Sequence, residues 1–228
     1  MTDPNQYEDE MADLVFFGTI TASVSHELNN IISTIDQVSG LLADHLASLA
    51  DGQLANPQRI RDVHERIARQ TSRASATIER LRTFAHSVDE PQQKFELHET
   101  LINLLALSER LANQKRVDLT VDSPTDPIWV TSRPFQLQRA LFHCLRRFWE
   151  AAPSPASVPV SVRRDGENVC IVMNGPAWQT TEPTTEPDEP LHTMMAELTG
   201  TVAVTETGGH TTCELVIPIT PPTDRAGA

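Results

Sequence analysis

A proline-free stretch near the amino terminus, residues 14–42, has the sequence LVFFGTITASVSHELNNIISTIDQVSGLL. Apolar side chains recur along it at the spacing of one helix face. These residues are Leu14, Phe17, Val24, Leu28, Ile31, Ile35, Val38 and Leu42. Because proline is absent from Asp9 to Ala50, we expect one long amphipathic helix over about residues 9–50.

A second stretch with helical spacing runs from Pro57, which suits a first helical position, to about Val88. Its apolar or small residues follow a near-heptad pattern with one stutter. They are Ile60, Val63, Ile67, Thr71, Ala74, Ile78, Leu81, Ala85 and Val88. Asp51-Gly52 and Asn56-Pro57 predict a turn between the two helices, and Glu90-Pro91 marks the end of the hairpin.

The two helices differ in charge. Residues 1–51 contain no Lys or Arg, whereas residues 57–86 contain seven Arg. This asymmetry favours antiparallel docking of the helices, although exposed ion pairs are individually weak. Two amphipathic helices cannot enclose a core by themselves, so we predict that the hairpin pairs with a second copy. The product would be a homodimer with a four-helix bundle.

After the hairpin the pattern changes to short strands alternating with helices. We predict strands at 94–97, 117–121, 128–130, 158–163, 168–173, 201–204 and 212–219, with a β-hairpin around Asp165-Gly166. We predict helices at 99–114, 135–151 and 191–198, and a flexible or extended Thr-, Glu- and Pro-rich linker at 179–190. The predicted class is α+β, with a helical hairpin over 1–90, an α/β domain over 91–220 and a tail over 221–228.

The composition favours a cytoplasmic protein. The formal net charge of −13 argues against a general affinity for nucleic acid. No apolar run reaches the roughly 18 residues of a membrane span, and the acidic amino terminus is unlike a signal peptide. Cys144, Cys170 and Cys213 lie far apart inside apolar segments, so we expect buried reduced thiols. No His or Cys spacing suggests a metal site.

His26 is the residue of greatest chemical interest. On a helical wheel it lies at about 200° from Val24, opposite the apolar stripe, so we expect the imidazole to be exposed. Its neighbours on that side of the helix are small or uncharged, which leaves room for another protein. These candidate docking residues are Thr19, Ala22, Ser23, Asn29, Asn30, Ser33 and Gln37.

Two neighbours of His26 could act on its imidazole. Glu27 can accept the Nδ1 proton and leave Nε2 as the nucleophile. Asn30 lies one helical turn further on, where its amide could position a water against a phosphoryl group.

The segments Phe17-Gly18 and Ser25-His26-Glu27-Leu28-Asn29-Asn30 resemble the phospho-acceptor region of bacterial sensor histidine kinases, in which the hairpin dimerises. Ile31 stands where that family usually has proline. The resemblance implies that His26 is the phosphorylation site, that Glu27 assists transfer, and that Asn30 supports dephosphorylation of a response regulator.

Residues 94–220 resemble, in element order, the ATP-binding domain of the same kinases, but the nucleotide motifs have degenerated. That family places asparagines near His143 and Arg147, and a guanidinium cannot ligate Mg²⁺. In the motif around Gly175, the family has aspartate in place of Met173 and glycine in place of Ala177. The acidic linker 179–190 stands where a glycine-rich phosphate loop would be. We therefore expect no ATP binding and no ATP-dependent autophosphorylation.

The layout also resembles ChpT-type histidine phosphotransferases, which keep the hairpin and abandon nucleotide. The implied function is a phosphorelay step in which His26 exchanges a phosphoryl group with the aspartates of response-regulator receiver domains. Mg²⁺ would come with the receiver, because this chain shows no metal site of its own. Three alternatives stay open: a non-catalytic regulator that binds a receiver or a kinase, a response-regulator phosphatase acting through Asn30, and an ATP-dependent kinase.

Overall fold

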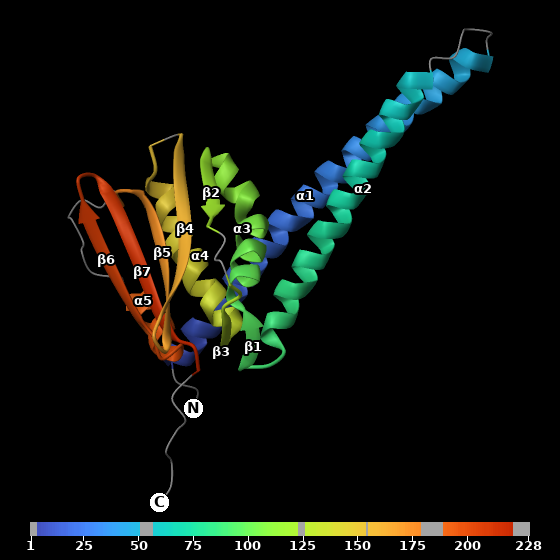
Figure 1. Cartoon of the computed structure of the whole chain (residues 1–228). Helices are drawn as coiled ribbons and strands as arrows, with labels where there is room; N and C mark the ends of the chain where they lie inside the picture. Colours follow the sequence, from blue (N-terminus) through green and yellow to red (C-terminus); the bar gives the residue numbers. More distant parts are fainter. Residues whose placement is uncertain (1–3, 51–56, 123–125, 154, 179–188, 221–228) are drawn as a thin grey trace, which may run out of the picture. The chain divides into compact units, whose positions relative to one another are not determined.

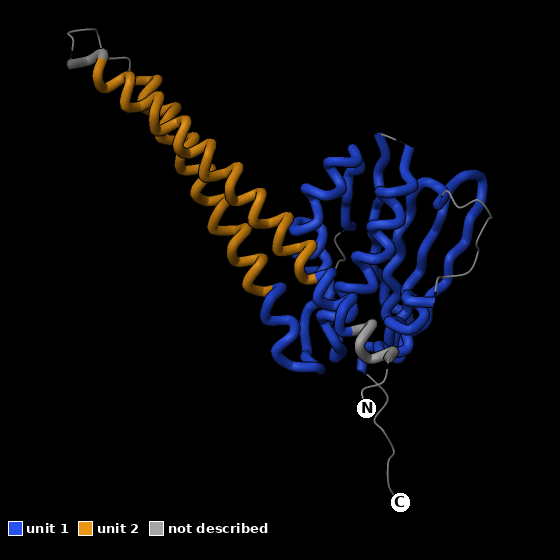
Figure 2. The backbone as a smooth tube through the Cα atoms, turned by 180° about the vertical axis from the view of Figure 1, so that it is seen from behind, with its two compact units in different colours: residues 1–16, 84–228 blue, residues 17–83 orange. Residues whose placement is uncertain are grey.

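The computed structural model describes residues 4–50, 57–122, 126–153, 155–178 and 189–220. The chain forms two compact units, which Figure 2 distinguishes by colour. One unit comprises residues 17–83, and the other combines residues 1–16 with residues 84–228. The first turns of the long amino-terminal helix therefore belong to the α/β unit. The domain boundary expected near residue 90 stays a prediction.

The two long helices form a hairpin, as predicted. Helix α1 covers Pro4–Ala50, and helix α2 covers Pro57–Ala85 before a single 3-10 turn, η1, at His86–Val88. Helix α1 begins about one turn earlier than predicted. The two helices run side by side in both views (Figures 1 and 2). The predicted turn residues 51–56 lie outside the described part of the chain.

The covered side of each helix in the hairpin is only partly the predicted one. On α2 the residues withdrawn from solvent alternate strictly between steps of three and four: Ile60, Val63, Ile67, Gln70, Ala74, Thr77 and Leu81. The predicted stripe is wrong at Thr71 and Ile78 on α2 and at Val88 in η1, which are all exposed. On α1, Leu14 is also wrongly predicted, since 66% of its side chain is exposed. Ile32 and Leu46 on α1 and Ile78 on α2 stay exposed, so a single chain does not cover all the large apolar side chains of the hairpin.

The α/β unit contains a five-stranded sheet with the order β2-β4-β5-β7-β6. Its strands are β2 (Val117–Val121), β4 (Ala156–Asp165), β5 (Asn168–Pro176), β6 (Thr201–Thr207) and β7 (His210–Pro218). Strand β2 pairs in parallel with β4, and every other pairing is antiparallel. A separate two-stranded sheet joins β1 (Gln93–Glu96) to β3 (Trp129–Ser132). All seven strands were predicted within a few residues.

Three helices pack with this sheet: α3 (Leu97–Gln114), α4 (Pro134–Ala151) and α5 (Glu189–Glu197). Helix α4 contacts both of the others as well as β5 (Figure 1). Strand β7 shows why one face is covered, because alternate residues Thr211, Cys213, Leu215 and Ile217 are all buried. Helix α5 begins at Glu189, so the last two residues of the predicted linker are helical, and residues 179–188 lie outside the described part.

The first turns of α1 are tied into the α/β unit by an aromatic cluster. The ring of Phe16 lies 5.4 Å from the rings of Phe84 and Phe135 and 5.1 Å from that of Phe142. One turn earlier, Asp13 accepts a 2.6 Å hydrogen bond from the almost fully buried guanidinium of Arg139. The sequence stripe did not identify either contact.

All three cysteines are buried free thiols, as predicted. The sulfurs of Cys144 on α4 and Cys213 on β7 lie 3.6 Å apart, which marks how closely α4 approaches the sheet. Burial raises the pKa of the Cys170 thiol, because the thiolate would lose its hydration.

Candidate functional site

His26 lies on the exposed side of α1, as the helical wheel predicts. Within the described residues its imidazole makes no hydrogen bond or ion pair. The regular helix around it satisfies the backbone polar groups, so the ring is a solvent-facing group on a stiff support. Such a group can reach a partner protein without any rearrangement of the backbone.

The surface around His26 contains most of the predicted docking residues. Ala22, Asn29, Asn30, Ser33 and Gln37 are exposed, and Thr19 is half-buried. Their role in docking stays a prediction.

The prediction of an exposed docking residue is wrong for Ser23, because only 2% of its surface is exposed. Its hydroxyl has no hydrogen-bond partner among the described residues. It shares the covered side of the helix with Ile20 and Glu27, which lie one turn away on either side.

The carboxylate of Glu27 is held by a residue that the sequence analysis did not identify. Its Oε1 atom accepts hydrogen bonds from Nη2 of Arg73 at 2.9 Å and from Nε of Arg73 at 3.2 Å. Only 18% of the Glu27 side chain is exposed, against 59% for Arg73. The contact crosses from α1 to α2. The run of arginines on α2 was a signal of such pairing, but the sequence alone did not indicate which arginine faces Glu27.

The residues expected at the degenerate nucleotide site lie on helix α4 and on strand β5 or just after it, two elements that are in contact. His143 and Arg147 lie one turn apart on α4, while Met173 and Gly175 lie on β5 and are buried. A Cβ atom placed on Gly175 would lie 2.5 Å from Cδ1 of Phe148, so the strand backbone approaches the ring very closely.

Trp178 lies beside these residues, and no pattern in the sequence indicates a role for it. It is only 4% exposed. The guanidinium carbon of Arg147 lies 4.2 Å from the centre of a Trp178 ring, and Phe148 contacts Trp178 edge to face at 5.2 Å between centroids. Arg147 is therefore a stacking residue here.

The turn at Gly208-Gly209 fixes the backbone next to Trp178. Both glycines have positive φ, and Gly209 accepts a 3.0 Å hydrogen bond from the Ala177 amide. The Thr211 hydroxyl accepts a second bond, of 3.1 Å, from the Trp178 amide. This hairpin turn therefore holds the backbone on which Trp178 is carried.

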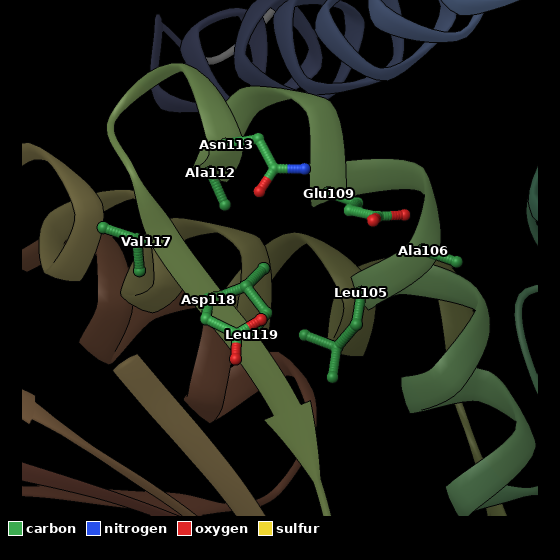
Figure 3. Close-up of a pocket in the computed structure, with 8 residues that line it drawn as sticks. All are labelled: Leu105, Ala106, Glu109, Ala112, Asn113, Val117, Asp118 and Leu119. Carbon is green, nitrogen blue, oxygen red and sulfur yellow. The ribbon is translucent and has the colours of Figure 1, made fainter. Parts of the chain in front are cut away.

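A small pocket lies elsewhere in the α/β unit, between α3 and β2 (Figure 3). Its volume is about 120 Å³, and Glu109 and Asp118 contribute carboxylates to its lining. Across the described residues, no group of three or more His, Cys, Asp or Glu side chains is placed to hold a metal ion. No described helix combines the length and apolar character needed to cross a membrane.

Comparisons with known proteins agree with this geometry. Residues 18–89 match the model of the His Kinase A (phospho-acceptor) domain. The C4-dicarboxylate transport sensor protein DctB of Pseudomonas aeruginosa is 27% identical over 171 residues, which are 72% of this chain and 27% of DctB. The chain thus spans about a quarter of that curated relative.

Two solved structures share the fold. The catalytic domain of histidine kinase ThkA has 14% identity and a TM-score of 0.50, covering 58% of this chain and 99% of that one. Histidine kinase ThkA in complex with response regulator protein TrrA has 17% identity and a TM-score of 0.51, covering 98% of this chain and 69% of that one. Residues 18–89 therefore match a phospho-acceptor domain, and the α/β unit has the fold of a histidine kinase catalytic domain.

Proposed function

We propose that this chain is a histidine phosphotransferase, in which His26 accepts a phosphoryl group from the aspartate of one receiver domain and passes it to another. The observation that carries the proposal is the exposed, unpaired imidazole of His26 inside the matched phospho-acceptor segment, next to an anchored carboxylate. A receiver partner is also supported by the similar ThkA structure, which holds a response regulator.

The proposed transfer needs only a nucleophile, a proton acceptor and correct alignment. Nε2 of His26 forms a bond to phosphorus, the bond from phosphorus to the aspartyl oxygen breaks, and its electron pair leaves with the receiver carboxylate. The imidazole becomes positively charged in this step, and Glu27 accepts the Nδ1 proton. The receiver supplies Mg²⁺ to neutralise the phosphoryl oxygens. In-line positioning by the docked proteins contributes the rest.

We propose further that the chain does this without ATP. Trp178, two residues after the end of β5, stacks with Arg147 and Phe148, and this filled space beside the strand supports the proposal. The thioether of Met173 cannot accept a strong hydrogen bond from an adenine amino group, as a carboxylate would. In this proposal the α/β domain has a structural role and does not bind nucleotide.

A homodimer is part of the same proposal. Large apolar side chains stay exposed on both helices of the hairpin unit: Ile32, Leu41, Leu46 and Ile78. A four-helix bundle with a second copy would bury those that share one side of a helix, such as Ile32 and Leu46. Sedimentation analysis should give twice the mass of the chain. A monomer at micromolar concentration would contradict this part of the proposal.

The deciding experiment is phosphoryl transfer from a panel of radiolabelled receiver domains, with His26→Ala as the matched variant. We expect an acid-labile label on the wild-type chain and none on His26→Ala. In a parallel reaction the chain is incubated with labelled ATP. Calorimetry separately measures whether ATP binds. Label from ATP, or saturable ATP binding, would contradict the ATP-independent mechanism. If the chain formed stable complexes with receivers but took up no label, the alternative of a non-catalytic, receiver-binding regulator would be correct.

Asn30 favours a second candidate function, dephosphorylation of a receiver. Its side chain is exposed one turn from His26, where an amide can hold a water for attack on an aspartyl phosphate. Free phosphate released from the labelled receiver, without label on His26, would favour this function over transfer.

A further inference from the structure

We propose that Arg73 is a positioning residue for phosphoryl transfer at His26, and that it acts by fixing the carboxylate of Glu27. The inference rests on the proposed phosphotransfer and assigns a task to a residue on the second helix of the hairpin. It starts from the two hydrogen bonds, 2.9 Å and 3.2 Å long, that Arg73 donates to one oxygen of Glu27.

The two oxygens of Glu27 are not equivalent in this arrangement. Oε1 takes both bonds from Arg73, whereas Oε2 has no hydrogen-bond partner among the described residues. Because Glu27 directly precedes Leu28 and follows His26 on the same helix, its remaining oxygen is the nearest carboxylate oxygen in sequence to the reacting imidazole. In the proposed transfer, Oε2 is the oxygen that takes the proton of His26.

A glutamate on a helix surface would otherwise move among several rotamers and share its oxygens with water. The planar guanidinium donates from Nε and Nη2 in a fixed fork, which holds direction as well as distance. The withdrawal of Glu27 from solvent, with only 18% exposed beside an exposed histidine, agrees with a side chain held in one place.

The geometry also links transfer to the pairing of the two helices. His26 and Glu27 lie on α1, while Arg73 lies on α2. A shift or rotation of α2 along α1 would move the guanidinium and release Oε1. The proton acceptor for the Nδ1 atom of His26 is then in place only when the hairpin has its correct register.

The test compares initial rates of His26 labelling in Arg73→Gln, Arg73→Lys, Glu27→Gln and the double variant. Arg69→Gln is the matched control, because it removes the same charge one turn away. Among the described residues, Arg69 pairs with an exposed Glu65 at 3.8 Å and not with Glu27. Phosphoramidate serves as the donor alongside a phosphorylated receiver. A defect with this small donor reports on the histidine site and not on receiver docking.

We expect Arg73→Gln to slow labelling by about tenfold with both donors, and Glu27→Gln by about a hundredfold, the usual range for loss of a positioned base. Arg73→Lys should recover part of the rate, and Arg69→Gln should match the wild type. The double variant should be no slower than Glu27→Gln alone, because Arg73 acts through Glu27.

Full additivity in the double variant, or wild-type rates for Arg73→Gln, would overturn the inference. Circular dichroism and sedimentation identify a variant that has lost its fold. If Arg73→Gln is unfolded, the labelling rate of Arg73→Lys, which keeps the charge, is compared with that of the wild type instead. If the wild-type chain takes label from no donor, the proposed phosphotransfer itself fails. A labelled wild type with an indifferent Arg73 refutes the positioning role alone.

Discussion

Replacing Gly175 with alanine is expected to destabilise the α/β unit, although it adds a single methyl group. An added Cβ would lie 2.5 Å and 2.9 Å from two carbons of the Phe148 ring and 3.2 Å from Cγ2 of Val158. An ordinary carbon–carbon contact needs about 3.5 Å or more, so the ring would have to retreat by about 1 Å. Phe148 is fully buried and Trp178 lies against it, so there is no free space to move into.

The expected cost is about 1–3 kcal/mol, typical of an extra methyl group in a packed core. For a unit of this size, each kcal/mol lowers the melting temperature by about 2–4 °C. Tryptophan fluorescence is the natural probe, because Trp129, Trp149 and Trp178 all lie in the α/β unit. Gly40→Ala is the control, because no atom lies near its added Cβ in helix α1. It lies in the hairpin unit, which contains no tryptophan, so its expected gain of about 0.5–1 kcal/mol is followed by circular dichroism, and the fluorescence transition of the α/β unit should not fall.

A second substitution tests the cause. Phe148→Leu removes the ring atoms that meet the new methyl group, so Gly175→Ala should cost less in that background than in the wild type. An unchanged melting temperature for Gly175→Ala, or costs that simply add, would refute the packing argument. The glycine would then need another explanation, such as close approach of a ligand to the strand.

Three further outcomes are expected. Asn30→Ala should leave labelling of His26 intact but slow phosphate release from a receiver; equal loss of both activities in an autoradiographic time course would contradict separate roles for His26 and Asn30. Burial raises the pKa of Cys170, so the unfolded chain loses this thiol proton first. The free energy of unfolding in urea should therefore fall as the pH rises above about 8.5, and Cys170→Ala should weaken that fall. Asp13→Asn removes the carboxylate that pairs with the buried Arg139 at 2.6 Å and should cost about 1–3 kcal/mol in thermal unfolding; no loss would mean that the other contacts of Arg139 suffice.

Most of the secondary structure could be predicted from the sequence because apolar periodicity is a local property. The alternation in β7 and the three-to-four-residue spacing in α2 each follow from one element alone. The choice of covered stripe is not local. Thr71 and Gln70 are adjacent on α2, and only the packing of the helices decides that Gln70 is withdrawn while Thr71 is exposed.

The candidate site shows the same division. The exposure of His26 follows from its place on the helical wheel, whereas the partner of Glu27 lies 46 positions away and was one of several arginines. Trp178 also escaped notice, because a tryptophan beside a loop carries no spacing signal. Its role becomes visible only when Arg147 and Phe148 are brought against it by helix α4.

The exposed apolar side chains of the hairpin have a consequence for abundance in the cell. If a second copy is what covers Ile32, Leu46 and Ile78, the free energy holding the hairpin together depends on how many copies are present, through mass action. When few copies are present, most of the chains would be monomers. A rise in expression would then increase the fraction of chains that are dimers. The number of competent phosphoryl carriers would then grow faster than the amount of protein made.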